Sequence, residues 1–185
     1  MIAELKSQTE AQMEKAIEAL RKEYARIRTG RASTGILDHI LVDYYGTATR
    51  LNQMATLSVP ESRTIVIQPW DASALKSIEK AILSSDMGLT PSNDGKVIRI
   101  TIPELTEERR REIVKVIRNM AEDCRVAVRH ARKEANDKLK KMEKEKEITE
   151  DALHKILDEI QKLTDRFVKK ADQVLQTKEE DVMTV

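Results

Sequence analysis

The chain has few of the residues from which catalytic and metal-binding sites are built. Its 185 residues include one cysteine, Cys124, and three histidines far apart in sequence. An intramolecular disulfide is therefore impossible, and no cluster of metal ligands is expected. The sequence also lacks a glycine-rich phosphate-binding loop and any spacing typical of a catalytic triad. These absences argue against an enzyme, and we expect neither a metal nor any other cofactor.

Aromatic residues and long apolar runs are scarce as well. Aromatics are only 3% of the chain, too few for a platform on which single-stranded bases could stack. No apolar run approaches 18 residues, so no membrane partner is predicted. Charged and apolar residues alternate from the first residue onward, without the hydrophobic segment of a secretory signal. We therefore expect a cytoplasmic protein.

The most informative stretch runs from Thr106 to Met142 without Gly or Pro. Its apolar residues recur every three or four positions, at Ile113, Ile117, Met120, Cys124, Val128, Ala131, Ala135, Leu139 and Met142. This spacing averages about 3.6 residues per turn, the period of a straight α-helix. Thr106 is the predicted N-cap, followed by two glutamates that suit the positive end of the helix dipole. A long helix is predicted here.

Two further apolar stripes with helical spacing flank the chain, over residues 2–28 and from Thr149 to Val174. Gly30 is a predicted helix stop for the first stripe, and Thr149 a predicted N-cap for the last. Three stripes of this length can bury one another. The sequence therefore predicts a three-helix bundle formed by residues 1–29 and 106–185.

The pattern changes between residues 32 and 103. Short runs rich in branched residues at 36–45, 64–68 and 96–102 indicate strands, residues 74–84 indicate a helix, and residues 91–95 a turn. We predict a small β/α/β domain inserted into the bundle, which makes the fold class α+β. The connections at residues 29–31 and 103–105 are predicted hinges, because two adjacent crossings restrain a domain weakly. The residues concerned are Thr29, Gly30, Arg31, Pro103, Glu104 and Leu105. A rigidly packed pair of element ends is the alternative.

Charge is unevenly distributed although the net charge is only +1. Residues 104–142 hold 12 Lys and Arg against 8 Asp and Glu, whereas residues 143–185 hold 8 against 12. On a helical projection of the long helix, several arginines fall within an arc of about 80° to 140° from Cys124, and several acids fall at about 220° to 280°. The arginines are Arg111, Arg118, Arg125, Arg129 and Arg132. A solvated helix face is one interpretation, and a ridge that follows a phosphate backbone is the other.

Four segments carry a family resemblance. They are ARIRTGRAS (Ala25 to Ser33), VDYYGT (Val42 to Thr47), LTEERRREIVK (Leu105 to Lys115) and RVAVRHARKEANDK (Arg125 to Lys138). In this order they resemble the signature segments of the bacterial ribosome recycling factor family. The resemblance extends over the full length of the chain.

The resemblance implies an L-shaped molecule in which a three-helix bundle is joined through a flexible hinge to a β/α/β domain. It implies binding to 23S rRNA of the large ribosomal subunit after termination. Together with GTP-bound elongation factor G, such a factor splits the ribosome and releases mRNA and tRNA. GTP hydrolysis belongs to that partner, so the chain needs no cofactor of its own.

The same resemblance implies a central rRNA contact at Arg132, supported by Arg129 and Arg28. With the helical face, the predicted rRNA-binding set is Arg132, Arg129, Arg125, Arg28, Arg118, Arg111, Lys133 and Arg31. We expect a monomer. The alternative is a coiled-coil-like scaffold or chaperone that binds protein partners, which ribosome co-sedimentation with and without nuclease would distinguish.

Overall fold

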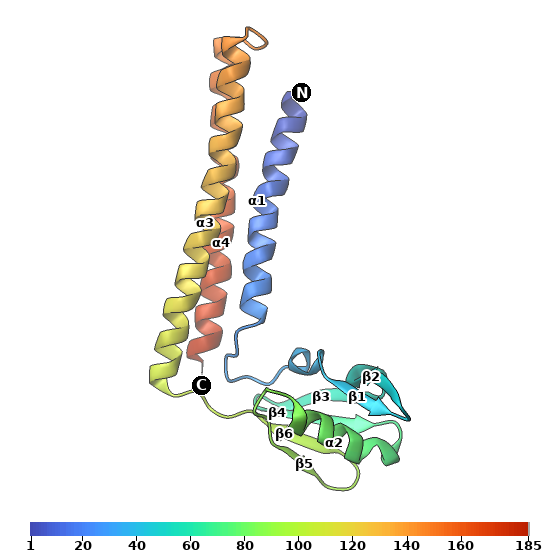
Figure 1. Ribbon diagram of the computed structural model, residues 1–185. Coiled ribbons are helices and arrows are strands. Elements are labelled where there is room, and N and C mark those ends of the chain that lie inside the picture. Colours follow the sequence, from blue (N-terminus) through green and yellow to red (C-terminus); the bar gives the residue numbers. More distant parts are fainter. Residues whose placement is uncertain (185) are drawn as a thin grey trace. The chain divides into compact units, whose positions relative to one another are not determined.

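The computed structural model describes residues 1–184, which divide into two compact units (Figure 1). One unit combines Met1–Thr29 with the chain from Thr106 onward, and the other is Gly30–Leu105. The chain leaves the first unit once and returns to it once. The second unit is therefore an insertion.

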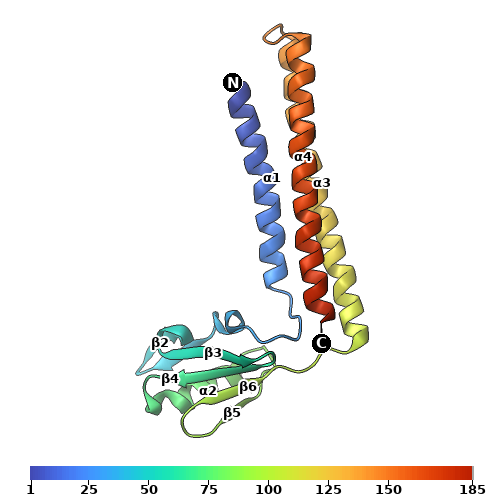
Figure 2. The same ribbon diagram turned by 180° about the vertical axis from the view of Figure 1, so that it is seen from behind.

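Three long helices form the first unit: α1 (Ile2–Ala25), α3 (Glu107–Lys144) and α4 (Glu150–Met183). They lie side by side along their length (Figures 1 and 2). Two predicted N-caps are confirmed, since the Thr106 hydroxyl accepts the Arg109 N–H at 3.1 Å and the Thr149 hydroxyl accepts the Ala152 N–H at 3.2 Å. Among the described residues, no helix has a stretch both long and apolar enough to cross a membrane.

The bundle core follows the predicted stripe of α3 with one change. Ala121 is buried in it, whereas Met120 and Met142 of the predicted stripe are only half-buried, Met142 packing against the core near Leu139. Small side chains are buried at Ala121, Cys124 and Ala131, and the Cys124 thiol donates to the Ala16 carbonyl of α1 at 3.5 Å. The larger buried side chains come from all three helices, among them Met13, Ile17, Ile117, Ile160 and Phe167. Burial of each such side chain contributes roughly 1.5–3 kcal/mol.

Helix α1 ends at Ala25, three residues before the end of its predicted range. Its last turn tightens, because the Arg26 N–H bonds to the Glu23 carbonyl at 3.2 Å and the Ile27 N–H to the Tyr24 carbonyl at 3.1 Å. Gly30 has a positive φ of 77° but lies beyond this turn. Gly30 therefore belongs to the connection and does not cap the helix.

The second unit is built on a four-stranded antiparallel sheet with strand order β3-β4-β6-β5. The strands are β3 (Ala55–Glu61), β4 (Thr64–Pro69), β5 (Pro91–Asn93) and β6 (Ile98–Thr101). Helix α2 (Leu75–Ser84) lies along one face of the sheet (Figure 1). Alternate residues of the central strands share a core with this helix, namely Ile65, Ile67, Ile98, Ile100, Ile78 and Ile82. The unit therefore has a core of its own.

Two local predictions for this unit need correction. Residues Thr34–Leu37 form a 3-10 helix that buries Leu37, so the strand predicted over 36–45 is reduced to β1 (Leu41–Tyr44). This strand pairs with β2 (Thr47–Arg50) through a two-residue turn with positive φ at Tyr45 and Gly46. The turn predicted over 91–95 is confined to its second half, where the Asp94 N–H bonds to the Val97 carbonyl at 3.2 Å and Gly95 has a φ of 89°. Pro91 begins the edge strand β5, which tolerates a residue without an N–H donor.

Tyr24 connects α1 to α3 within the bundle. Its side chain is buried, and its hydroxyl donates a hydrogen bond to the Ile117 carbonyl at 2.7 Å. Burial raises the pKa of Tyr24 to about 12. The folded state therefore holds this proton more tightly than the unfolded chain, whose tyrosine pKa is about 10.

This proton linkage predicts a specific alkaline instability. The contribution of Tyr24 to stability is complete below about pH 10 and is lost as the pH rises through about 12. We expect Tyr24→Phe to lower the free energy of unfolding by about 1 kcal/mol at pH 7 and to flatten its fall between these pH values. Urea unfolding followed by circular dichroism measures both effects. Tyr45→Phe, at an exposed position, is the control, and identical pH profiles for the two variants would contradict the assignment.

Candidate nucleic-acid interface

Three of the predicted arginines lie along the contact between α3 and α4, which we call the α3–α4 seam. Arg118 is ion-paired with Glu179, and Arg125 contacts Asp172 at 2.7 Å. Arg132 donates a hydrogen bond to Gln161 Oε1 at 3.0 Å. The two helices run antiparallel, so the step of seven residues from Arg118 to Arg125 is met by a step of seven backward along α4, whereas Arg132 meets a residue eleven positions before Asp172. The seven-residue spacing of Arg118 and Arg125 therefore places both side chains against acids of α4.

Arg125 has two carboxylate partners and a largely buried side chain. Its side chain is 18% exposed and contacts Glu122 at 2.8 Å in addition to Asp172. Burial alone would lower the pKa of Arg125, but hydrogen bonds to these two carboxylates outweigh it and raise the pKa. The guanidinium therefore joins α3 to α4 and is not displayed to solvent. The prediction of a continuous arginine ridge open to a ligand is wrong at this position.

Two acids that the helical projection passed over share the arginine face. Glu107 is ion-paired with Arg111, and Glu122 accepts hydrogen bonds from both Arg125 and Arg129. These hydrogen bonds, that from Arg125 first, lower the pKa of Glu122. The signs of charge are therefore less segregated on α3 than the sequence indicated. Glu122 could have been found from its spacing of three and seven residues from the two arginines.

Cations nevertheless gather on the C-terminal half of α3, around a shallow depression that we call the basic hollow. Its lining is Val126, Arg129, His130, Arg132, Lys133, Asn136, Asp137 and Lys140. Four of these side chains are cationic at neutral pH and one is anionic. Within residues 1–184, neither Lys133 nor Lys140 forms an ion pair. A surface of this kind suits an extended polyanion.

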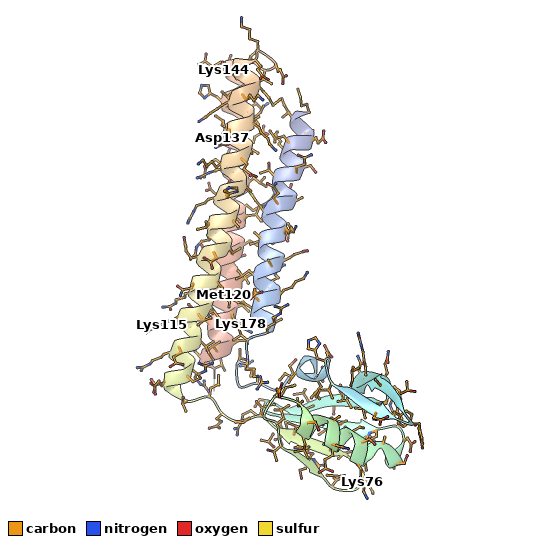
Figure 3. All side chains as sticks on the ribbon, viewed as in Figure 1. Lys76, Lys115, Met120, Asp137, Lys144 and Lys178 are labelled. Atoms are coloured by element: carbon orange, nitrogen blue, oxygen red, sulfur yellow. The ribbon has the colours of Figure 1, made fainter. Side chains whose placement is uncertain are left out.

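A second depression lies between α1 and α4, at the level of Met120, whereas Asp137 of the basic hollow lies toward the other end of the bundle (Figure 3). Two of its three Lys and Arg side chains are less available, Arg21 being the exception. Lys170 is bound to Glu14 at 2.7 and 2.9 Å, and burial lowers the pKa of Lys178. Asp181 also lines this depression. The basic hollow is therefore the stronger candidate for phosphate binding.

The remaining predicted site residues lie elsewhere. Arg28 follows the end of α1, which packs beside Ile117, whereas the start of α1 at Leu5 packs against Ala135 and Leu139. Arg28 is thus separated from Arg132 by about half the length of the bundle, roughly 30 Å at 1.5 Å per residue. Arg31 belongs to the second unit. The structure does not gather these two arginines into the basic hollow.

The two predicted hinge connections meet at the edge of the second unit. A Cβ atom placed on Gly30 would lie 3.2 Å from Leu105 Cγ. The adjoining backbone is anchored to the turn between β3 and β4, since the Ala32 N–H bonds to the Ser62 carbonyl and the Ile102 N–H to the Arg63 carbonyl, each at 2.7 Å. Glu104 contacts Arg63 at 3.2 Å. The chain therefore enters and leaves this unit at one place.

These features define a class of two-domain protein: a long three-helix bundle with a basic helix face, interrupted by a small antiparallel-sheet domain. The family model of the ribosome recycling factor matches residues 20–183. The chain belongs to the ribosome recycling factor family, whose members are translation factors and not enzymes. The resemblance of the four signature segments and the α+β fold class are thereby confirmed.

Individual relatives agree over the full length. The ribosome-recycling factor of Oleidesulfovibrio alaskensis is 58% identical over 178 residues, which cover 96% of this chain and 97% of that protein. A solution structure of the ribosome recycling factor is 41% identical with a TM-score of 0.76, covering 100% of this chain and 98% of the other. Models of the T. thermophilus ribosome recycling factor and E. coli elongation factor G bound to the E. coli post-termination complex include a chain that is 48% identical. Its TM-score is 0.65, and both chains are covered completely.

The seam predicts that Arg125 acts in stability. We expect Arg125→Ala to lower the free energy of unfolding by about 1–2 kcal/mol, because it leaves Asp172 without its partner and Glu122 with Arg129 alone. Arg129→Ala, which removes a more exposed partner of the same Glu122, should change stability little. Thermal unfolding of both variants makes the comparison. A larger loss of unfolding free energy for Arg129→Ala than for Arg125→Ala would contradict a stabilising role for the ion pairs of the α3–α4 seam.

Proposed function

We propose that this chain recycles ribosomes after termination. It binds the large subunit through 23S rRNA and, with elongation factor G and GTP, splits the ribosome into subunits and releases mRNA and tRNA. The family match over residues 20–183 carries this proposal, and a solved relative bound with elongation factor G to a post-termination complex supports it. The chain acts in the cytoplasm as a monomer, without a cofactor of its own.

The basic hollow is the proposed centre of rRNA binding. Arg129, Arg132, Lys133 and Lys140 are spaced so that they recur on one face of α3 and can follow a phosphate backbone. Arg132 is the best placed of them, because a guanidinium can contact a phosphate through two parallel hydrogen bonds and its partner in the seam is a neutral amide. Arg28, Arg31 and Arg111 would then be outlying contacts. Arg118 and Arg125 contribute mainly by holding α3 against α4.

The bundle is suited to transmit force along its length. Ion pairs join α3 to α4 through Arg118 and Arg125, and a second set joins α1 to α4 through Lys6–Glu159, Glu10–Arg166 and Glu14–Lys170. Each pair is partly exposed and modest by itself, but together with the continuous core they oppose sliding between the helices. We propose that elongation factor G acts on the second unit, and that the paired connections at Gly30 and Leu105 are the hinge.

Arg132→Ala tests the rRNA contact. The side chain lies outside the core, so we expect normal thermal unfolding but at least a ten-fold loss of affinity for isolated bacterial large subunits. The dependence of log affinity on log salt should flatten by about one unit, because one phosphate contact is lost. Arg109→Ala, which removes an exposed arginine of the same helix, is the control. Unchanged affinity across several salt concentrations, or co-sedimentation that survives nuclease treatment, would contradict the proposal.

Gly30→Ala tests the hinge. Its positive φ and the nearby Leu105 side chain both oppose a Cβ atom, so the connection must shift. We expect unchanged binding to large subunits and a several-fold slower splitting of post-termination ribosomes by elongation factor G and GTP, measured by light scattering. Gly46→Ala is the matched control, since Gly46 also has a positive φ but its added Cβ meets no atom within 4 Å. Equal splitting rates for the two variants would argue against a hinge at Gly30.

A further inference from the structure

The α3–α4 seam treats its third arginine differently from the first two. Arg118 and Arg125 each meet a carboxylate of α4, at Glu179 and Asp172. The next step of seven residues along α4 leads to Asp165, and the next arginine of α3 is Arg132. The expected ion pair is absent among the described residues, because Arg132 donates its hydrogen bond to Gln161 instead.

Gln161 lies between the arginine and the acid. Its Oε1 accepts from Arg132 Nη1 at 3.0 Å, and its Nε2 donates to Asp165 Oδ1 at 2.8 Å. Only one orientation of the amide satisfies both neighbours, because a guanidinium can only donate and a carboxylate can only accept. The relay from Arg132 through Gln161 to Asp165 is therefore fixed in direction. The guanidinium is oriented by a neutral oxygen, and the carboxylate is kept from direct contact with it.

A neutral partner has a consequence for a phosphate ligand. A phosphate that binds an arginine must replace the partner that the arginine already has, and a carboxylate partner also attracts and neutralises the guanidinium charge, which a neutral amide does not. Arg125 is paired with two carboxylates, so binding a phosphate would require it to break two ion pairs. Arg132 gives up one bond to an amide, and its charge is not already cancelled. The seam thus restrains the arginine side chain without neutralising it.

We propose that Gln161 is a positioning residue for rRNA binding, which acts by holding Arg132 in the basic hollow through a neutral hydrogen bond. The inference rests on the proposed function, since it assumes that Arg132 contacts rRNA. It assigns to α4 a role in a site whose other residues all belong to α3. Asp165 fixes the amide orientation and is the second member of the device.

Gln161→Glu tests the proposal with almost no change of shape. The new carboxylate pairs directly with Arg132, and we expect affinity for isolated large subunits to fall about ten-fold, with the salt dependence flattened by about one unit. The matched control is Gln176→Glu. Gln176 lies on the same helix and donates to Glu180 at 3.1 Å with the same spacing, and no arginine of α3 bonds to it within residues 1–184. Gln176→Glu should keep the affinity and salt dependence of the unaltered protein.

Two further variants separate positioning from simple charge repulsion. In an Arg132→Ala background, Gln161→Glu should cause no additional loss, whereas repulsion of rRNA by the added charge would weaken binding again. Gln161→Ala adds no charge but lets Arg132 reach Asp165, so it should also weaken binding, and adding Asp165→Asn should restore it. Circular dichroism and thermal unfolding confirm that each variant is folded.

The possible failures are distinguishable. If Arg132→Ala leaves large-subunit binding unchanged, the rRNA site is misplaced and both proposals fall. If Arg132→Ala weakens binding while Gln161→Glu behaves like Gln176→Glu, the site stands and the positioning role is overturned. A further loss from Gln161→Glu in the Arg132→Ala background overturns the positioning role as well.

Discussion

The antiparallel packing of α3 against α4 is the constraint on which the functional surface depends. The buried stripe of α3 sets which residues face the other helices, and the direction of α4 then sets which charges meet at the margin. Arginines at steps of seven are matched with acids at steps of seven because both helices present the same margin after two turns. The register of α3 against α4 therefore decides which arginines are neutralised by acids of α4 and which remain available at the surface.

Helix α4 forms ion pairs with both of the other long helices. Its basic residues Arg166 and Lys170 pair with acids of α1, and its acids Asp172 and Glu179 pair with arginines of α3. This arrangement explains how a chain with a net charge of +1 can carry a local cationic surface. Several charges are matched across helix contacts, and the C-terminal half of α3 carries more Lys and Arg than Asp and Glu. Such a surface attracts a polyanion to one face and not to the whole molecule.

The inserted unit has a different physical character. Its core is complete in itself, formed by the sheet, α2 and the adjoining hairpin. Its two covalent connections meet where Gly30 lies against Leu105, and the neighbouring backbone is held by hydrogen bonds to the turn after β3. A unit with its own core and a single point of attachment can be moved without unfolding either part. That property fits a factor proposed to receive force from a partner while its bundle stays bound.

The sequence by itself determined the features that depend on near neighbours in the chain. The two threonine N-caps, the three apolar stripes, the inserted unit and the family resemblance could all be recognised from periodicity, capping residues and local motifs. Local patterns were less reliable for residues that occur in several kinds of environment. Ala121, and not Met120, is buried in the core, and Pro91 begins an edge strand. In each case packing against a neighbouring element outweighed the preference of the residue.

Only the tertiary structure decided the state of each arginine. A helical projection of α3 places Arg118, Arg125 and Arg132 on one face but contains no information about the acids and amide of α4, which lie tens of residues away in sequence. Whether a guanidinium is neutralised or merely oriented depends on which atom of the opposite helix lies within about 3 Å of it, since hydrogen bonds weaken rapidly with distance. The sequence could thus indicate a basic helix, whereas the register of two helices determined which of its arginines remain available to bind a ligand.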